Sequence, residues 1–295
     1  MPDSSDASAI FAILESYKNV VNPEFGYAIA RRLAYGDPIP DGTIISRWIP
    51  ILFQNKPLST GFEFITLLER SIKQDTWSAV LQLFEYLTRS YLHLRKRISW
   101  KDDDSDKKPT ADVELIFYGN YSLLNKIWEE NLKLKLPELA FRLWPILIQN
   151  LSYAYQLLNS WGKADSTGDP LSWHRSAIGP HDQDRHPDNQ DILINAARDC
   201  MEWALENVPH VGLAWIEVLS VMDPLILRRL AVHGIAFAPH LSANDKIKWM
   251  LDKDFVITPG MKHEIFQLFK NAYPDADSAL RMILIKTIMP LALKM

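Results

Sequence analysis

The stretch QDILINAARDCMEWA, residues 190–204, carries the most regular hydrophobic pattern of this chain. Its apolar side chains recur every three or four positions, which places them on one face of an α-helix. They are Ile192, Leu193, Ala196, Ala197, Cys200, Trp203 and Ala204. The stretch therefore predicts an amphipathic helix whose apolar face packs against neighbouring helices.

The same spacing continues towards the C-terminus in shorter segments. Asp223 is expected to cap a helix with Pro224 at its first position, and Ser242 with Asp245 resembles a capping box. Asp275 or Asp277 is expected to open the last helix. Before it, the pattern predicts helices over residues 211–221, 224–237, 243–251 and 259–272.

Two of these segments resemble each other. DPLILRRLAVHGI, Asp223 to Ile235, aligns with DADSALRMILIKTI, Asp275 to Ile288. An acid, an arginine and aliphatic residues at helical spacing are typical of a HEAT-type repeat, in which arginine and acid bridge neighbouring repeats. Two ordinary capped helices would give the same pattern, so both interpretations stay open. The apolar residues up to Met295 lack a polar terminal cap, which predicts a piece of a longer protein.

Helical spacing also governs the chain before residue 190. Pro50 and Pro145 lie inside two of the predicted helices and are expected to kink or split them. No segment shows a comparable period of two, so no sheet is expected. The predicted helices are residues 8–21, 24–34, 43–52, 59–73, 75–97, 111–132 and 137–161.

These segments predict an all-α fold of stacked antiparallel helix pairs, a HEAT-like α-solenoid with irregular long loops. An N-terminal helical lobe is expected over residues 1–100 and a C-terminal repeat lobe over residues 111–295. Between them, residues 101–110 contain KDDDSDKK and no large apolar side chain, which predicts a charged, flexible loop. A long ordered loop is expected at residues 162–189, since connections of this length are uncommon and often functional.

Composition limits the classes of function. A net charge of -4 and a pI of about 6.1 argue against a dedicated nucleic-acid-binding protein. A single cysteine, Cys200, excludes an intramolecular disulfide, and the N-terminus carries no secretory signal, so we expect a cytoplasmic protein. Polar residues interrupt the longest apolar stretch, 137–161, which argues against a membrane span.

The long loop contains the most versatile side chains. LSWHRSAIGPHDQDRH, Leu171 to His186, brings three histidines, two arginines and two aspartates beside one tryptophan. One interpretation is a structural ion network, because arginine pairs with carboxylates in a planar, bidentate way. Another is a partner-binding surface anchored by the tryptophan and the arginines. Both assign the same candidate residues: Trp173, His174, Arg175, His181, Asp182, Asp184, Arg185 and His186.

The alternative is an enzyme, a metal-dependent hydrolase using the histidines and aspartates of residues 174–186. The spacings match no common zinc or calcium motif, and no nucleotide-binding or nucleophile motif is present. We therefore expect no catalytic residue, no metal ligand and no cofactor. Trp173 is expected to pack on the helices, with Arg175 and Arg185 paired to nearby carboxylates.

The run HRSAIGPHDQDRHPDNQDILINAARD, His174 to Asp199, resembles a segment of large prokaryotic antiviral defence proteins. These antiphage proteins, of the sirtuin-associated and STAND NTPase kind, join an effector to a long helical region. Asp223 to Leu251 is similar to part of that region, although Gly179 stands where the family segment has an acidic residue. The resemblance implies a C-terminal, sensor-type helical repeat region. Its expected partner is a phage protein or the effector domain of the same longer chain, with self-association left open.

Overall fold

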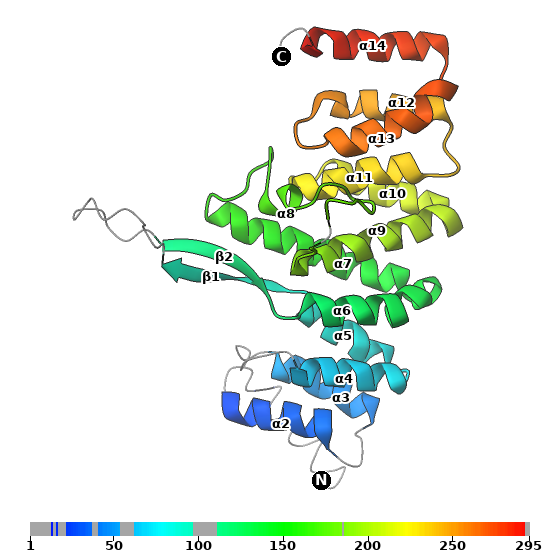
Figure 1. Ribbon diagram of the computed structural model, residues 1–295. Coiled ribbons are helices and arrows are strands. Elements are labelled where there is room, and N and C mark those ends of the chain that lie inside the picture. Colours follow the sequence, from blue (N-terminus) through cyan, green and yellow to red (C-terminus); the bar gives the residue numbers. More distant parts are fainter. Residues whose placement is uncertain are drawn as a thin grey trace, which may run out of the picture. The chain divides into compact units, whose positions relative to one another are not determined.

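The computed structural model describes residues 13, 16, 22–36, 41–53, 62–96, 111–184 and 186–292. It divides into two compact units, one of residues 1–90 with 117–132 and the other of residues 91–116 with 133–295. The described residues are mostly helical, which confirms that the fold is all-α as predicted (Figure 1). The predicted charged loop at 101–110, the predicted helix at 8–21 apart from residues 13 and 16, and Arg185 lie outside the described residues.

The first unit is a small helical bundle. Asn22 caps its first described helix by accepting a hydrogen bond from the Glu24 backbone amide at 2.8 Å. Pro50 does not split α3, which continues to Leu52, because the helix face around it is buried. The helices of this unit are α2 (Pro23–Tyr35), α3 (Gly42–Leu52), α4 (Phe62–Lys73), α5 (Trp77–Leu87), α6 (Tyr121–Ile127) and the π-helix η1 (Trp128–Leu132).

Two predictions for the middle of the chain are wrong. The helix expected to run to Arg97 ends at Leu87, and residues 90–96 and 111–117 form the strands β1 (Ser90–Lys96) and β2 (Ala111–Phe117) of a two-stranded sheet. The Thr88 hydroxyl hydrogen-bonds the carbonyl of Phe84 at the helix end, a contact that competes with helix continuation. Residues 111–132 are therefore a strand followed by α6 and η1, not one helix.

The second unit contains the predicted helix of residues 190–204, which is α9 (Asn189–Asn207). The apolar side chains of this helix are largely inaccessible to solvent and pack between α7 on one side and α10 and α11 on the other. Cys200 is fully buried among them, so it belongs to the core as predicted. Helix α7 (Leu136–Ser160) passes through Pro145 without a break, because Leu143, Trp144 and Leu147 around it are buried.

After α9, each helix of this unit packs against at least one helix that precedes it, as the layers from yellow-green to red in Figure 1 show. The predicted capping box of Ser242 and Asp245 is confirmed. Pro224 rather than Asp223 occupies the N-cap of α11, where no side chain caps the helix. The remaining elements are η2 (Lys133–Lys135), α8 (Pro170–Trp173), α10 (Pro209–Ser220), α11 (Leu225–Phe237), α12 (Ala243–Asp252), η3 (Phe255–Ile257), α13 (Lys262–Ala272), η4 (Tyr273–Asp275) and α14 (Ser278–Ala292).

Helix α7 corresponds to the longest apolar stretch of the sequence. Neither it nor any other helix in the described part of the chain has the length and apolarity that crossing a membrane requires.

Candidate functional site

The predicted long loop connects α7 to α9 in the second unit, and most of it has no regular structure. Its one helical turn, α8, begins where Asp169 accepts hydrogen bonds from the backbone amide and the hydroxyl of Ser172, at 2.9 and 3.0 Å. Asp169 is fully buried, and burial raises the pKa of its carboxyl, although these hydrogen bonds oppose the rise. The loop is thus fixed at this point by a buried carboxylate.

Arg229 of α11 holds the inner side of the loop. Its guanidinium has five N–H donors, and all of them are used. Nη1 donates to the carbonyls of Ser172 at 2.6 Å and Arg175 at 2.9 Å, and Nη2 donates to the carbonyl of Ser176 at 3.0 Å. The other two bonds, from Nε and Nη2, reach the two carboxylate oxygens of Glu264 at 3.1 and 2.9 Å. One side chain therefore binds three carbonyl groups of the loop backbone.

Glu264 of α13 completes this anchor. Its Oε1 also accepts the backbone amide of Ile178 at 3.1 Å, so that the carboxylate binds both Arg229 and the loop. The side chains of Arg229 and Glu264 are 3% and 2% exposed. Because a buried charge is tolerated only when it is paired and hydrogen-bonded, the pair fixes α11, α13 and the loop to one another.

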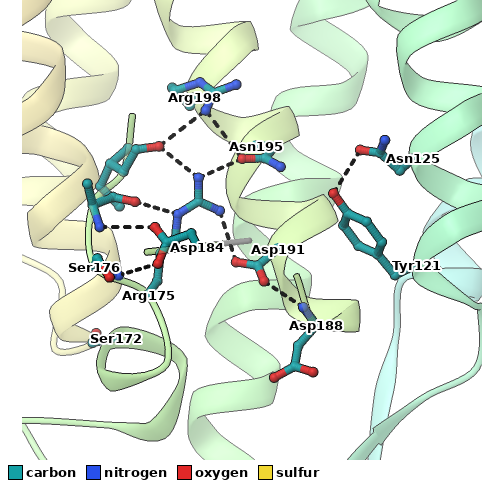
Figure 2. Close-up of polar contacts among 12 residues, drawn as sticks. Tyr121, Asn125, Ser172, Arg175, Ser176, Asp184, Asp188, Asp191, Asn195 and Arg198 are labelled. Carbon is teal, nitrogen blue, oxygen red and sulfur yellow. Dashed lines mark hydrogen bonds and ion pairs between the residues drawn. The ribbon is translucent and has the colours of Figure 1, made fainter. Parts of the chain in front are cut away.

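Arg175 is the second anchor, and it belongs to the loop itself (Figure 2). It binds loop backbone through Nε, which donates to the Ala177 carbonyl at 2.6 Å, and Nη2, which donates to the Ile178 carbonyl at 2.8 Å. It reaches α9 through Asp191 Oδ1 at 3.0 Å and Asn195 Oδ1 at 2.6 Å. The predicted pairing of Arg175 with a carboxylate is confirmed.

Burial has opposite effects on the two partners of this ion pair. It lowers the pKa of the Arg175 guanidinium and raises the pKa of the Asp191 carboxyl, and in neither group does their mutual attraction reverse the direction. Desolvation thus outweighs the attraction. The value of the pair lies in positioning the loop rather than in net stabilisation by charge.

Asp184 closes the loop on itself. Its carboxylate accepts the backbone amides of Ser176 at 2.9 Å and Ala177 at 3.4 Å. Burial alone would raise the pKa of Asp184, but these hydrogen bonds, with the charge of Arg175, lower it. Of the predicted site residues, Arg175 and Asp184 therefore both bind the backbone of residues 176–178, while the carboxylate that pairs with Arg175 is Asp191, outside the predicted set.

The tip of the loop lies against α13. The imidazole of His181 accepts the Gln183 backbone amide at Nδ1, at 3.2 Å, and meets the ring of His263 edge to face with 5.0 Å between centroids. Asp182 beside it is exposed, as are His174 and His186. Of the three loop histidines, His181 is therefore partly covered, whereas His174 and His186 face solvent.

The prediction that Trp173 packs on the helices is wrong. Its side chain is 67% exposed, and its indole lies over Gly168, where an added Cβ would be 2.6 Å from the ring. Leu171, Ala177 and Ile178 supply the apolar anchors of the loop instead, with at most 1% exposure. The tryptophan is consequently exposed at the surface, on a backbone that Arg175 and Arg229 hold by hydrogen bonds.

The hydrolase alternative requires a group of side chains that can hold a metal ion. Across the described ranges, no three histidine, cysteine, aspartate or glutamate side chains converge in a way that could hold a metal ion. The remaining candidate, Arg185, is outside those ranges.

The most important anchors were not among the predicted site residues. Arg229 was visible only as the arginine of a suspected repeat, whose acidic partner was expected in the neighbouring repeat. The acid that pairs with Arg229 is Glu264, 35 positions away, and no local sequence pattern marks it.

The fold and the loop define an all-α protein with a surface loop anchored by buried arginines. Comparisons with protein-family models, curated proteins and solved structures found no match.

Proposed function

We propose that this chain is a non-catalytic recognition region, in which the loop between α7 and α9 presents Trp173 to a protein partner. The observation that carries the proposal is the exposed indole, 67% accessible, on a loop whose backbone is bound by Arg175 and Arg229. A rigid, exposed tryptophan is a typical energetic centre of protein interfaces.

The inner contacts explain why this loop suits binding. Binding usually costs free energy because mobile side chains and loops become ordered. Here the carbonyls of residues 172, 175, 176, 177 and 178 are already hydrogen-bonded to arginines. The loop backbone is therefore already ordered when the protein has folded, so that binding of a partner requires little further loss of conformational entropy. His174, Asp182 and His186 are exposed on the same loop and offer further polar groups to a partner.

The resemblance of residues 174–199 to antiviral defence proteins supplies the biological context of the proposal. In that context the region senses a phage protein or regulates a linked effector, as the resemblance implies. In this proposal, binding of the partner to the loop triggers the defence response, and the helical unit that carries the loop passes the signal to the effector.

The test compares cells that produce the full-length protein with Trp173→Ala or with a matched control. Phe62→Ala is the control because Phe62 is another exposed aromatic side chain, 63% accessible, in the other unit. Plating of a phage panel should show protection by the wild type and by Phe62→Ala. Trp173→Ala should reduce that protection at least about tenfold, because an exposed tryptophan of this kind supplies a large part of the binding free energy of an interface.

Thermal melting separates this result from misfolding. Since Trp173 is exposed, its removal should leave the melting temperature within about 1–2 °C of the wild type. Full protection by a folded Trp173→Ala protein would contradict the proposed contact. Absence of protection by the wild type against every phage would contradict the defence role.

A further inference from the structure

Helix α14 exposes an unusually apolar face. Met282 and Met289 are 58% and 56% accessible, and Ile283 and Ile285 are 52% and 42% accessible. Met282, Ile285 and Met289 recur at the spacing of one helix face, so they form a continuous stripe along the axis. Exposed apolar residues gathered in this way mark an interaction surface.

The opposite face of α14 is already occupied. Leu280 and Leu284 are 8% and 2% exposed and lie on the side that packs against α12 and η3. The helix therefore has a fixed position in the second unit, and its apolar outer side is not needed for that packing (Figure 1, red).

The charges on α14 are all positive. Lys286 is exposed and lies between Met282 and Met289 on the outer face. Arg281 stands at the edge of this face, with its guanidinium 5.7 Å from the ring centroid of Tyr273. Helix α14 itself, Ser278–Ala292, contains no acidic residue. The outer face is thus apolar with a central cation.

Within the described ranges, no carboxylate forms an ion pair with Lys286. Asp277, which precedes the helix, accepts the side-chain amide of Asn244 at 2.6 Å, while its backbone amide donates to Asn244 Oδ1 at 2.9 Å. These contacts turn Asp277 towards α12. Its carboxylate is therefore engaged away from the outer face of α14.

We propose that this face, Met282, Ile283, Ile285, Lys286 and Met289, docks an acidic amphipathic helix of another protein. A helix fits because the stripe runs along the axis of α14, and two such stripes pack by interdigitation. Methionine side chains adapt to the partner surface. An acidic side chain opposite Lys286 satisfies the central cation.

The charge also argues against a second copy as the occupant. A two-fold pairing centred on this face brings two Lys286 ammonium groups together, and like charges repel. The proposed surface is separate from the Trp173 loop, so it stands independently of the recognition function proposed above.

The experiment uses two synthetic helical peptides of about 20 residues, long enough to be helical. One carries a leucine stripe with glutamate elsewhere, and the other has lysine in place of each glutamate. Binding to the intact chain is measured by fluorescence anisotropy at about 0.15 M salt, where distant charges are screened. The glutamate peptide should bind, and the lysine peptide should bind at least about tenfold more weakly.

Variants locate the contact. Lys286→Glu should reverse or erase the preference for the glutamate peptide, and Ile285→Asp should abolish its binding. Val218→Asp on α10, where Val218 is 59% exposed, is the matched control and should bind as the wild type does. Unchanged circular dichroism establishes that each variant is folded.

Four results would overturn the proposal: no binding of the glutamate peptide, equal binding of both peptides, no effect of Lys286→Glu, or an equal loss in Val218→Asp. Sedimentation adds a fifth. A wild-type dimer that Ile285→Asp dissociates would show that a second copy covers the face.

Discussion

Replacement of Arg229 by leucine tests the central anchor of the loop. The substitution keeps the apolar inner part of the side chain but is shorter, and it removes all five hydrogen bonds of the guanidinium. Glu264 then keeps only the Ile178 backbone amide, at 3.1 Å, as a partner in the contacts described above. The carbonyls of Ser172, Arg175 and Ser176 lose their donor.

The magnitude follows from the stranded carboxylate. Glu264 has a side chain that is only 2% exposed, so water cannot replace the lost arginine without disrupting the packing. Breaking a buried pair by removing one partner costs about 3–5 kcal/mol. That is a large share of the about 5–15 kcal/mol that stabilises a typical native protein. The three loop carbonyls add less, because a loosened loop can expose them to water.

The double variant gives the sharper result. Arg229→Leu with Glu264→Leu removes the stranded charge along with its partner. We expect it to be destabilised by only about 1–3 kcal/mol, the cost of unsatisfied loop backbone groups. The double variant should therefore be more stable than Arg229→Leu alone, although it carries one more substitution.

The measurement is urea unfolding at neutral pH, followed by circular dichroism, with the slope of the transition compared between variants. Arg228→Leu is the matched control, since Arg228 is the adjacent arginine and contacts the carbonyls of Ser166 and Asp223 at the surface. It should lose less than about 1 kcal/mol. A double variant that loses the sum of the two single losses would refute the reasoning, because it would show no coupling between the two side chains.

Two further predictions concern the loop. Gly168→Ala should alter the fluorescence of Trp173, because an added Cβ would lie 2.6 Å from the indole and force the ring to move; an emission spectrum identical to that of the wild type would contradict the described ring position. Asp184→Asn should lower stability at pH 7, because the pKa of Asp184 is lowered on folding by the amides of Ser176 and Ala177. A carboxyl group whose pKa is lowered on folding stabilises the folded state at pH values above its unfolded pKa of about 3.9, and this stabilisation is lost as the pH falls through the lower, folded pKa. The difference in stability between wild type and Asp184→Asn should therefore shrink as the pH falls below about 3.9. Urea titrations at several pH values measure this difference, and a constant difference would disprove the assignment.

The helical part of the fold was predictable because its pattern is local. In α9 the apolar residues repeat through more than three turns, and no competing period fits them. The strand β1 was missed because Leu87, Tyr91 and Leu94 continue the helical spacing of α5 into it. Only pairing with β2 decides its structure, and that pairing depends on residues outside the local window.

The partner strand did carry a signal. Val113, Leu115 and Phe117 alternate with Asp112 and Glu114, which is the period-two pattern of a strand. The strand has only seven residues, however, Ile116 interrupts the alternation, and the apolar residues that follow suit a helix. For this reason the short strand was predicted as part of the helix that follows it.

The candidate site was predictable only in part. The charge balance of the loop pointed to an ion network, and Arg175 with Asp184 belongs to it. The partner of Arg229 could not be found from sequence, because Glu264 reaches it only once α13 packs beside α11. Trp173 was predicted to be buried because a large apolar residue in a loop suggests burial. In the structure Ala177 and Ile178 are the buried apolar residues of the loop instead.

The chemistry of arginine explains how such a loop can be both irregular and ordered. A long segment outside helices and sheets leaves backbone carbonyls without partners, and burying them unsatisfied is unfavourable. Arg229 and Arg175 supply the missing donors, while Glu264 and Asp191 neutralise the buried cations. All of these contacts lie beneath the loop. The exposed side chains of the loop, above all that of Trp173, contribute little to the stability of the fold. Substitutions at these positions can therefore change which partner is bound without changing the structure of the loop.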